Sequence, residues 1–173
     1  VNDNQAPTAT CPLSQSLTAL AGQCYASAIY STPTATDNCS PIPTIIRISG
    51  PASGSNFPVG ATVVNWRATD GAGLTSTCSF TVTVTDNQLP IISCPADLAV
   101  TALPGECSAT VTYPNATATD NCNVTSVYLL IGLASGSEFP QGATVNTWRA
   151  VDASGSSVTC SFTVTVSCGT GAQ

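Results

Sequence analysis

The chain has 173 residues, of which only 7 % are charged, and nine acidic residues against three basic ones give a formal net charge of −6. Three scattered arginines cannot follow a phosphate backbone or hold an anionic membrane surface, which excludes nucleic-acid binding. Lysine, histidine and methionine are absent, so the usual catalytic bases are missing and we expect no catalytic residue and no enzyme activity. No apolar run approaches the roughly 18 residues of a membrane span, so we expect no membrane insertion.

Cysteine usage indicates the compartment in which the chain works. Nine cysteines in a chain of this length are rare in the reducing cytosol and typical of secreted proteins. Zinc is the alternative, but zinc sites pair cysteines at close spacing or add histidine, and this sequence has neither. We therefore expect structural disulfides and an extracellular location, secreted or at a cell surface. Because no signal peptide opens the sequence, we expect a mature processed chain or a fragment of a longer array.

In chain order, the first predicted element is a linker, residues 3–7 (Asp-Asn-Gln-Ala-Pro), which returns in the middle of the chain as residues 86–90. Short predicted strands follow each linker. Residues 78–85 alternate Cys, Phe and Val with Ser and Thr, the period of two that is typical of a half-buried strand, and residues 107–113 alternate similarly. Glycine and proline punctuate the stretches between them, and no window has helical periodicity. The pattern predicts an all-β sandwich.

An internal repeat divides the chain. Four cysteines recur in register, as Cys11, Cys24, Cys39 and Cys78 and again as Cys94, Cys107, Cys122 and Cys160. The neighbouring text repeats with them, and residues 78–84 match residues 160–166 letter for letter. Repeats of this length are whole domains rather than solenoid turns. We predict two modules, residues 1–86 with an N-terminal linker strand and residues 87–173.

The repeated motifs resemble the hyalin-repeat (HYR) family of immunoglobulin-like extracellular modules. They are an opening Cys-Pro, a central Thr-Asp-Asn-Cys, a Phe-Pro-x-Gly turn, an Asp-x-x-Gly turn after a Trp-bearing strand, and a closing Cys-x-Phe-x-Val-x-Val. The resemblance covers the whole chain twice. It implies two tandem immunoglobulin-like antiparallel β-sandwiches stapled by disulfides, with an adhesion-related role. The fold alone does not determine what such a module binds.

Four cysteines in a module allow three pairings. We predict that the first bond staples a short hairpin and that the second ties a central loop to the last strand. The rival is a link between sheets, Cys24–Cys78. Cys168 is left over, as a free thiol or as one half of an intermolecular disulfide. The predicted bonds are Cys11–Cys24, Cys39–Cys78, Cys94–Cys107 and Cys122–Cys160.

The linker motif precedes each module, and nothing like it follows the second. If one subunit joined another head to tail, the N-terminal segment of the neighbour could complete an exposed sheet edge, and a contact that does not close builds a filament. The predicted partner is then a second copy of the chain, and the predicted assembly residues are Val1, Asn2, Asp3, Asn4, Gln5 and Pro7. Two alternatives stay open. In the first, the modules are cut from a longer array and form an adhesion module that binds carbohydrate, protein or other extracellular surface components. In the second, they accompany a secreted enzyme.

Six of the nine acidic residues lie in loop motifs. Calcium needs six to eight oxygens, typically from several carboxylates together with amide and backbone carbonyls. The linker at residues 86–90 is similar to the calcium-binding linker of cadherins, although the glutamates and the Asp-x-Asp of that site are missing. The alternative is local turn chemistry, because Asp and Asn bond their own backbone. We expect no obligatory cofactor and hypothesise a calcium ion at Asp3, Asp37, Asp86, Asn87 and Asp120.

Three triplets match the acceptor pattern for N-linked glycosylation. They begin at Asn38, Asn115 and Asn123. The pattern makes these asparagines candidates for glycosylation, and a glycan on Asn38 would compete with an ion bound beside it.

Overall fold

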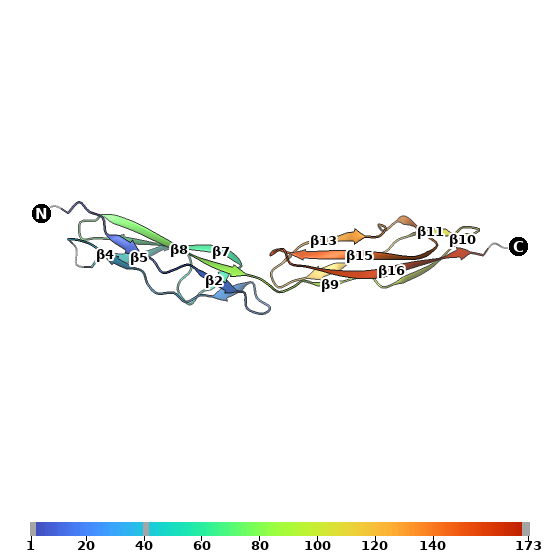
Figure 1. The fold of residues 1–173 in the computed structure, drawn as a ribbon, viewed down its shortest axis with the longest axis horizontal. Coiled ribbons are helices and arrows are strands. Elements are labelled where there is room, and N and C mark those ends of the chain that lie inside the picture. Colours follow the sequence, from blue (N-terminus) through green and yellow to red (C-terminus); the bar gives the residue numbers. More distant parts are fainter. Residues whose placement is uncertain (1–2, 40–41, 171–173) are drawn as a thin grey trace. The chain divides into compact units, whose positions relative to one another are not determined.

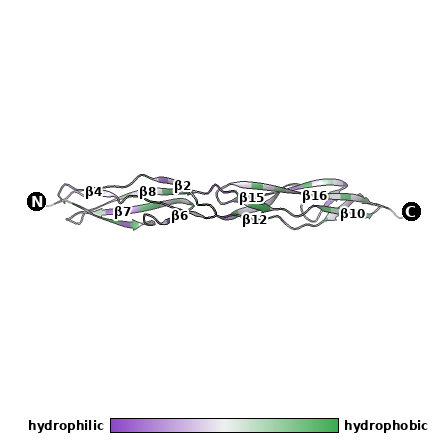
Figure 2. Cartoon of the chain, turned by 90° about the horizontal axis from the view of Figure 1, so that it is seen from below, coloured by the Kyte–Doolittle hydropathy of each residue, from purple (hydrophilic) through white to green (hydrophobic). Residues whose placement is uncertain are grey.

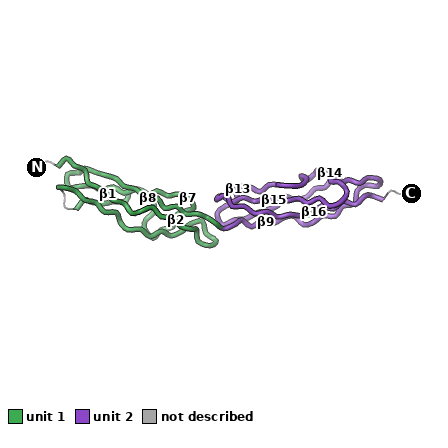
Figure 3. The backbone as a smooth tube through the Cα atoms, in the orientation of Figure 1, with its two compact units in different colours: residues 1–87 green, residues 88–173 purple. Residues whose placement is uncertain are grey.

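The structure, a computed structural model, describes residues 3–39 and 42–170. Its described residues form strands and turns without a helix, which confirms the predicted all-β fold (Figure 1). Within this part of the chain no helix has the length and hydropathy that a membrane span requires. The chain divides into two compact units, residues 1–87 and residues 88–173 (Figure 3).

The first unit contains eight strands in two layers. Its main sheet has the order β2-β8-β7-β5, and the other layer consists of two short ladders, β1-β4 and β3-β6. The strands are β1 (Thr8–Thr10), β2 (Gln15–Thr18), β3 (Tyr25–Ser27), β4 (Thr34–Thr36), β5 (Thr44–Ser49), β6 (Asn56–Pro58), β7 (Gly60–Thr69) and β8 (Thr75–Thr85).

The second unit repeats this topology. Its main sheet has the order β10-β16-β15-β13, beside the ladders β12-β9 and β11-β14. The strands are β9 (Ile91–Ser93), β10 (Leu98–Pro104), β11 (Ser108–Val111), β12 (Thr117–Thr119), β13 (Val124–Ile131), β14 (Ser137–Pro140), β15 (Gly142–Asp152) and β16 (Ser157–Gly169).

One strand pair in each main sheet departs from the predicted antiparallel arrangement. β2 runs parallel to β8, and β10 runs parallel to β16, whereas the other pairs are antiparallel. The parallel strand arrives from the second layer by a loop, so it joins the sheet at its edge rather than through a hairpin. As a result β2 and β10 each form one edge of a main sheet, and β5 and β13 form the opposite edges.

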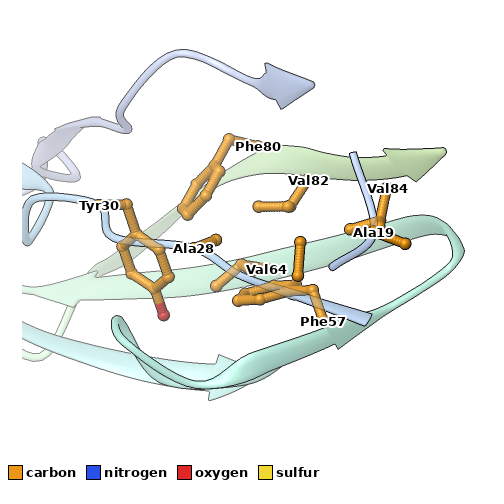
Figure 4. Close-up of a cluster of buried hydrophobic side chains, with 9 residues drawn as sticks. Ala19, Ala28, Tyr30, Phe57, Val64, Phe80, Val82 and Val84 are labelled. Atoms are coloured by element: carbon orange, nitrogen blue, oxygen red, sulfur yellow. The ribbon is translucent and has the colours of Figure 1, made fainter. Parts of the chain in front are cut away.

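The core of the first unit lies between its two layers (Figure 4). The period of two along β8 places Val82 and Val84 inward, where they are almost fully buried. The ring of Tyr30 packs edge-on against Phe57 and Phe80, with centroids 6.4 and 4.8 Å apart. Its hydroxyl donates a hydrogen bond to the Pro51 carbonyl, so the buried phenol is satisfied.

The second core uses the same arrangement. Tyr113 packs edge-on against Phe139 and Phe162, with centroids 6.3 and 4.8 Å apart, and its hydroxyl donates to the Leu133 carbonyl. Burial raises the pKa of the Tyr113 phenol. Full burial of each such aromatic or aliphatic side chain contributes about 1.5–3 kcal/mol. Figure 2 shows hydrophobic stretches on strands of both units, as expected from two separate cores.

The predicted disulfide pairing is wrong. Cys11 is bonded to Cys78, with Cα atoms 5.6 Å apart, and Cys94 is bonded to Cys160, with Cα atoms 5.8 Å apart. Cys11 follows β1 in one layer and Cys78 lies on β8 in the other, so the bond joins the layers instead of stapling a hairpin. The rival pairing of Cys24 with Cys78 correctly placed a bond between the sheets but is excluded, because Cys78 is bonded to Cys11.

The remaining cysteines also correct the sequence prediction. Cys168, expected to lack an intramolecular partner, is bonded to Cys107, with Cα atoms 4.2 Å apart. β16 continues to Gly169, whose N–H donates to the Glu106 carbonyl, and this pairing places the end of the strand beside the turn that carries Cys107. Cys39, expected in a disulfide, is a free and exposed thiol. Cys24 and Cys122 are disulfide-bonded, but their predicted partners are engaged elsewhere.

Candidate functional site

Three carboxylates meet at one end of the first unit. Asp3 precedes β1 and Asp37 directly follows β4, and the antiparallel pairing of these strands brings both residues to the same end. Asp70 opens the turn between β7 and β8. One oxygen of each carboxylate lies within 4.8 Å of an oxygen of the other two. Two of the predicted calcium ligands, Asp3 and Asp37, are therefore neighbours.

Asp70 is the residue that the predicted ligand set missed. Its Oδ1 accepts hydrogen bonds from the N–H groups of Ala72 and Leu74, both at 2.9 Å, and these bonds shape the β7–β8 turn. The side chain is buried, with 8 % of its surface exposed, and its Oδ2 has no hydrogen-bond partner among the described residues. The signal that pointed to it was the repeated Asp-x-x-Gly motif, which sequence reasoning had assigned to turns only.

The other two aspartates also shape their own turns. Oδ2 of Asp37 accepts from the N–H of Cys39 at 3.0 Å, and Oδ1 of Asp3 accepts from the N–H of Gln5 at 3.2 Å. These bonds are the local turn chemistry that was the alternative to calcium. The two interpretations are compatible, because a carboxylate that uses one oxygen for a turn keeps a second oxygen for a ligand.

The cluster concentrates negative charge. Two carboxylates about 4 Å apart repel by about 1 kcal/mol in water and about 4 kcal/mol at the dielectric typical of a protein surface. The arginines lie on the main sheets: Arg47 and Arg67 are exposed on β5 and β7, and Arg149 donates to the hydroxyl of Ser157 at 2.7 Å. A positive charge bound among the three aspartates would offset their repulsion.

The negative charge of the cluster affects the pKa of the Cys39 thiol. The thiol is exposed, and its pKa is raised by loss of hydration in its immediate surroundings and by the negative charges of Asp3 and Asp37. An ordinary thiol is a few per cent thiolate at neutral pH, so Cys39 is less reactive at that pH than an isolated cysteine.

The second unit carries the same turns at the matching positions. Oδ2 of Asp120 accepts from the N–H of Cys122, and Oδ1 of Asp152 accepts from the N–H groups of Ser154 and Ser156, all at 2.8 Å. Oδ1 of Asp120 and Oδ2 of Asp152 are buried and bonded to none of the residues described. Of the other predicted ligands, Asp86 is buried and Asn87 is exposed.

The predicted assembly residues differ in their surroundings. Val1 and Asn2 lie outside the described residues. Asn4 and Gln5 are exposed, whereas Pro7 is buried in its own unit, directly before β1. Residues from Thr8 onward pair with β4 of the same chain. Within the described part of this segment, residues 4–6 are exposed and accessible to a partner.

All three predicted glycosylation asparagines are exposed, and glycosylation itself stays a prediction. The triplet of Asn38 includes Ser40, which lies outside the described residues. Asn123 has a φ of 104°, and the hydroxyl of Thr125 in its triplet donates to the carbonyls of Val151 and Asp152.

A hollow of about 510 Å³ opens on the second unit. It lies between β10, the edge strand of the main sheet, and β11, the edge strand of the second layer. Its floor combines apolar side chains such as Val100 and Leu103 with the carboxylates of Glu106 and Glu138. Leu103 is 75 % exposed. The hollow thus offers unpaired strand edges, apolar surface and hydrogen-bond acceptors in one place.

Comparison with known proteins identifies the repeated unit. The family model of the HYR domain matches residues 2–84 and again residues 85–166. The protein named hyalin from Strongylocentrotus purpuratus is 32 % identical over 170 residues, which cover 95 % of this chain and 14 % of that protein. Hyalin from Lytechinus variegatus is 36 % identical over 141 residues, or 79 % of this chain and 26 % of that protein. The chain thus spans well under two thirds of either relative.

Among solved structures, the extracellular cadherin domains 3–6 of protocadherin gamma B2 align with 96 % of this chain and 52 % of their own, at a TM-score of 0.41 and 15 % identity. The family model, by contrast, accounts for nearly every residue in two consecutive matches that follow the internal repeat. The chain therefore belongs to the HYR domain family, as its sequence motifs indicated.

Proposed function

We propose that this chain is an extracellular structural unit that assembles head to tail, with residues 4–6 of one copy docking on the second module of the next. The observation that carries the proposal is the hollow between β10 and β11. Both strands lie at the edge of their ladders, and an extended segment gains main-chain hydrogen bonds when it adds to such an edge.

The N-terminal segment suits this acceptor. Asn4 and Gln5 are exposed and bear amide N–H groups that can donate to Glu106 and Glu138. Each copy carries a net charge of −6, so the contact should strengthen with salt, which screens the mutual repulsion of the copies. A contact between one end of a copy and the other end of the next is heterologous, and such contacts extend into filaments when they do not close.

An extracellular structural role also accounts for the chemistry of the chain. The disulfides persist only in an oxidising environment. The absence of histidine and lysine leaves no conventional base or nucleophile partner, which favours a mechanical role over a catalytic one.

Electron microscopy of the purified chain tests the proposal, because it predicts long polymers. Leu103→Arg places a charge in the hollow at an exposed position, so it should leave the fold intact and abolish the polymers. The matched control is Leu20→Arg, at the equivalent exposed position of the first module, and it should polymerise normally.

A second pair of variants tests the donor segment. Asn4→Gly with Gln5→Gly should abolish polymers, while Asn87→Gly with Gln88→Gly, the same change in the internal copy of the motif, should not. A wild-type chain that stays monomeric at high concentration, as measured by light scattering, would contradict self-assembly.

A different observation favours the second candidate function, an adhesion module with an external ligand. Both modules expose apolar side chains at matching positions on the outer face of the main sheet, and exposed apolar patches mark interaction surfaces. These residues are Ile46, Ile48 and Val63 in the first module and Tyr128, Leu130 and Val145 in the second. A monomeric chain that binds a cell surface, and loses binding in Ile48→Ser with Leu130→Ser, would support this candidate instead.

A further inference from the structure

The geometry points to a binding site for one divalent cation, of the calcium class, formed by Asp3, Asp37 and Asp70. The three residues come from three separate segments of the first unit, and their nearest oxygens lie within 4.8 Å of one another. That spacing matches carboxylates that share one ion, because two oxygens bound at 2.3–2.6 Å from the same calcium lie at most about 5 Å apart. The site adjoins residues 4–6, which the proposed head-to-tail assembly uses, but the observations behind it do not depend on that assembly.

The buried carboxylate of Asp70 is the observation that indicates a bound ligand. Its carboxylate is more than nine-tenths buried, and Oδ1 is already shared between the N–H groups of Ala72 and Leu74. Oδ2 is buried without a partner in the described chain. A buried carboxylate oxygen that makes no hydrogen bond costs desolvation energy, and a missing ion is one of the few ways in which native proteins resolve such a group.

The second module repeats the observation independently. Oδ2 of Asp152, at the position that matches Asp70, is also buried without a partner, and so is Oδ1 of Asp120, at the position that matches Asp37. Asp152 is only 2 % exposed, and its Oδ1 makes the same pair of turn bonds. The buried Oδ2 is therefore a shared feature of both Asp-x-x-Gly turns, and in the first module the carboxylate that bears it lies in a cluster with Asp3 and Asp37.

The donor set selects the ion. Three carboxylates on three separate loops are hard oxygen ligands, and backbone carbonyls and water can supply the remainder of the six to eight that calcium takes. Magnesium demands a near-ideal octahedron at shorter distances, which three independent loops are less able to form. Zinc prefers nitrogen and sulfur ligands, whereas the chain has no histidine and the free thiol of Cys39 is a single sulfur beside three carboxylates.

A bound ion would link the segment before β1 to the main sheet of the first unit. Asp3 belongs to the segment before β1, Asp37 follows β4 in the same ladder, and Asp70 belongs to a hairpin of the main sheet. One ion would therefore cross-link both layers of the sandwich at the end where the first module begins. It would also replace the mutual repulsion of the three carboxylates by attraction to a shared charge.

Calorimetric titration and thermal unfolding of the full chain test the site. The chain is first stripped with a chelator and then titrated with calcium chloride or magnesium chloride to about 5 mM, since extracellular calcium modules bind at about 10⁻⁴–10⁻³ M. We expect binding heat and a rise in the melting temperature with calcium, and a smaller rise with magnesium at the same ionic strength. No heat and no rise with calcium would overturn the proposal.

Asp70→Asn is the diagnostic variant. Asparagine keeps an Oδ1 that can accept from Ala72 and Leu74, so the turn is preserved, but it removes the charge and the second carboxylate oxygen. We expect the variant to lose one equivalent of bound calcium, with at least about tenfold weaker affinity at this site. Its melting temperature in chelator should equal or exceed that of the wild type, because the repulsion is relieved.

Asp97→Asn is the matched control. Asp97 is exposed, and its Oδ1 accepts from the N–H of Thr163 at 2.7 Å, so it resembles Asp70 in bonding an amide but lies outside the cluster. It should bind calcium like the wild type. Wild-type stoichiometry and affinity in Asp70→Asn would overturn the proposal. If Asp70→Asn fails to fold, Asp3→Asn, in the segment before the first strand, must show the same loss of one equivalent for the proposal to stand.

Discussion

The two modules keep one core and differ at their ends. Tyr30 and Tyr113 occupy equivalent places between two phenylalanines, with ring distances that agree within 0.1 Å. By contrast, Cys39 is a free thiol whereas its counterpart Cys122 is disulfide-bonded, and Cys168 has no counterpart in the first module. A core side chain is constrained by many neighbours at once, while a terminal cysteine needs only one partner within reach. The repeat therefore preserves its fold through the core and varies its covalent links at the ends.

Removing the disulfide between layers should have the largest effect, and the effect should differ between the modules. Cys11→Ala with Cys78→Ala opens a bond between residues 67 positions apart, and chain entropy predicts a loss of about 4 kcal/mol in the free energy of unfolding. Cys94→Ala with Cys160→Ala opens a bond between residues 66 positions apart, but the loss should be smaller, because the remaining Cys107–Cys168 bond already shortens that loop in the unfolded chain. Differential scanning calorimetry should resolve the transition of the affected module. A loss in the second module that equals or exceeds the loss in the first would contradict this explanation.

The next largest effect concerns Gly132, which directly follows β13. Gly132 has a φ of 109°, and a Cβ on it would lie 2.2 Å from Oδ1 of Asn146 and 2.8 Å from the carbonyl oxygen of Val145. Gly132→Ala should cost about 3 kcal/mol, from the left-handed backbone together with the clash. Gly136→Ala is the control, because Gly136 has a φ of 86° but open space around it, and it should cost only about 1–2 kcal/mol. Equal losses in chemical denaturation would refute the steric contribution.

One core position differs between the modules for a reason that the backbone explains. Val64 of the first module corresponds to Asn146 of the second, and both are fully buried. Oδ1 of Asn146 accepts a hydrogen bond from the N–H of Leu133 at 2.8 Å. The first module has Pro51 at the position of Leu133, and proline has no N–H to satisfy. The second module therefore has asparagine at this core position because Asn146 accepts the hydrogen bond of the Leu133 N–H.

This dependence predicts a double-mutant cycle. Asn146→Val alone should destabilise the second module by about 1–3 kcal/mol, because it leaves the N–H of Leu133 without its acceptor. Leu133→Pro with Asn146→Val copies the first module and should recover most of that loss. Denaturant unfolding of the wild type, both single variants and the double variant gives the coupling free energy. Additive effects would mean that the hydrogen bond does not explain the difference between the modules.

Periodic patterns of residues carried most of the fold prediction. The alternation along residues 78–84 and 160–166, repeated in register, was enough to predict tandem all-β sandwiches, because strand faces follow directly from a period of two. The disulfide pairing could not be predicted in this way. It depends on which loop crosses to the opposite layer, and the parallel entry of β2 and β10 leaves no local signal. Cys168 was misassigned because β16 extends beyond the residue that matches the end of β8.

The candidate site was predicted in part for a similar reason. Asp3 and Asp37 stood out because they lie in repeated loop motifs, and the ladder β1-β4 brings them together. Asp70 lies in an equally regular motif, Asp-x-x-Gly, but the turn alone was sufficient to explain an aspartate there. The burial of its Oδ2 and its closeness to Asp3 and Asp37 depend on tertiary structure, which the motif does not report.

The smallest predicted effect is a change in the rate at which Cys39 is alkylated. Cys39 should be the thiol that iodoacetamide labels in the native chain, since it is free and exposed, and Cys39→Ser should remove the labelling. Its raised pKa means that labelling should be slower than that of a free cysteine at neutral pH and should increase as the pH rises through a value above the ordinary one. Asp3→Asn removes one of the negative charges that raise this pKa, so it should lower the pKa and speed labelling by a few-fold at pH 7, measured by mass spectrometry in the presence of a chelator. Asp97→Asn removes an equal charge far along the chain and should leave the rate unchanged. A rate that is insensitive to Asp3 would mean that the carboxylate cluster does not act on this thiol in solution.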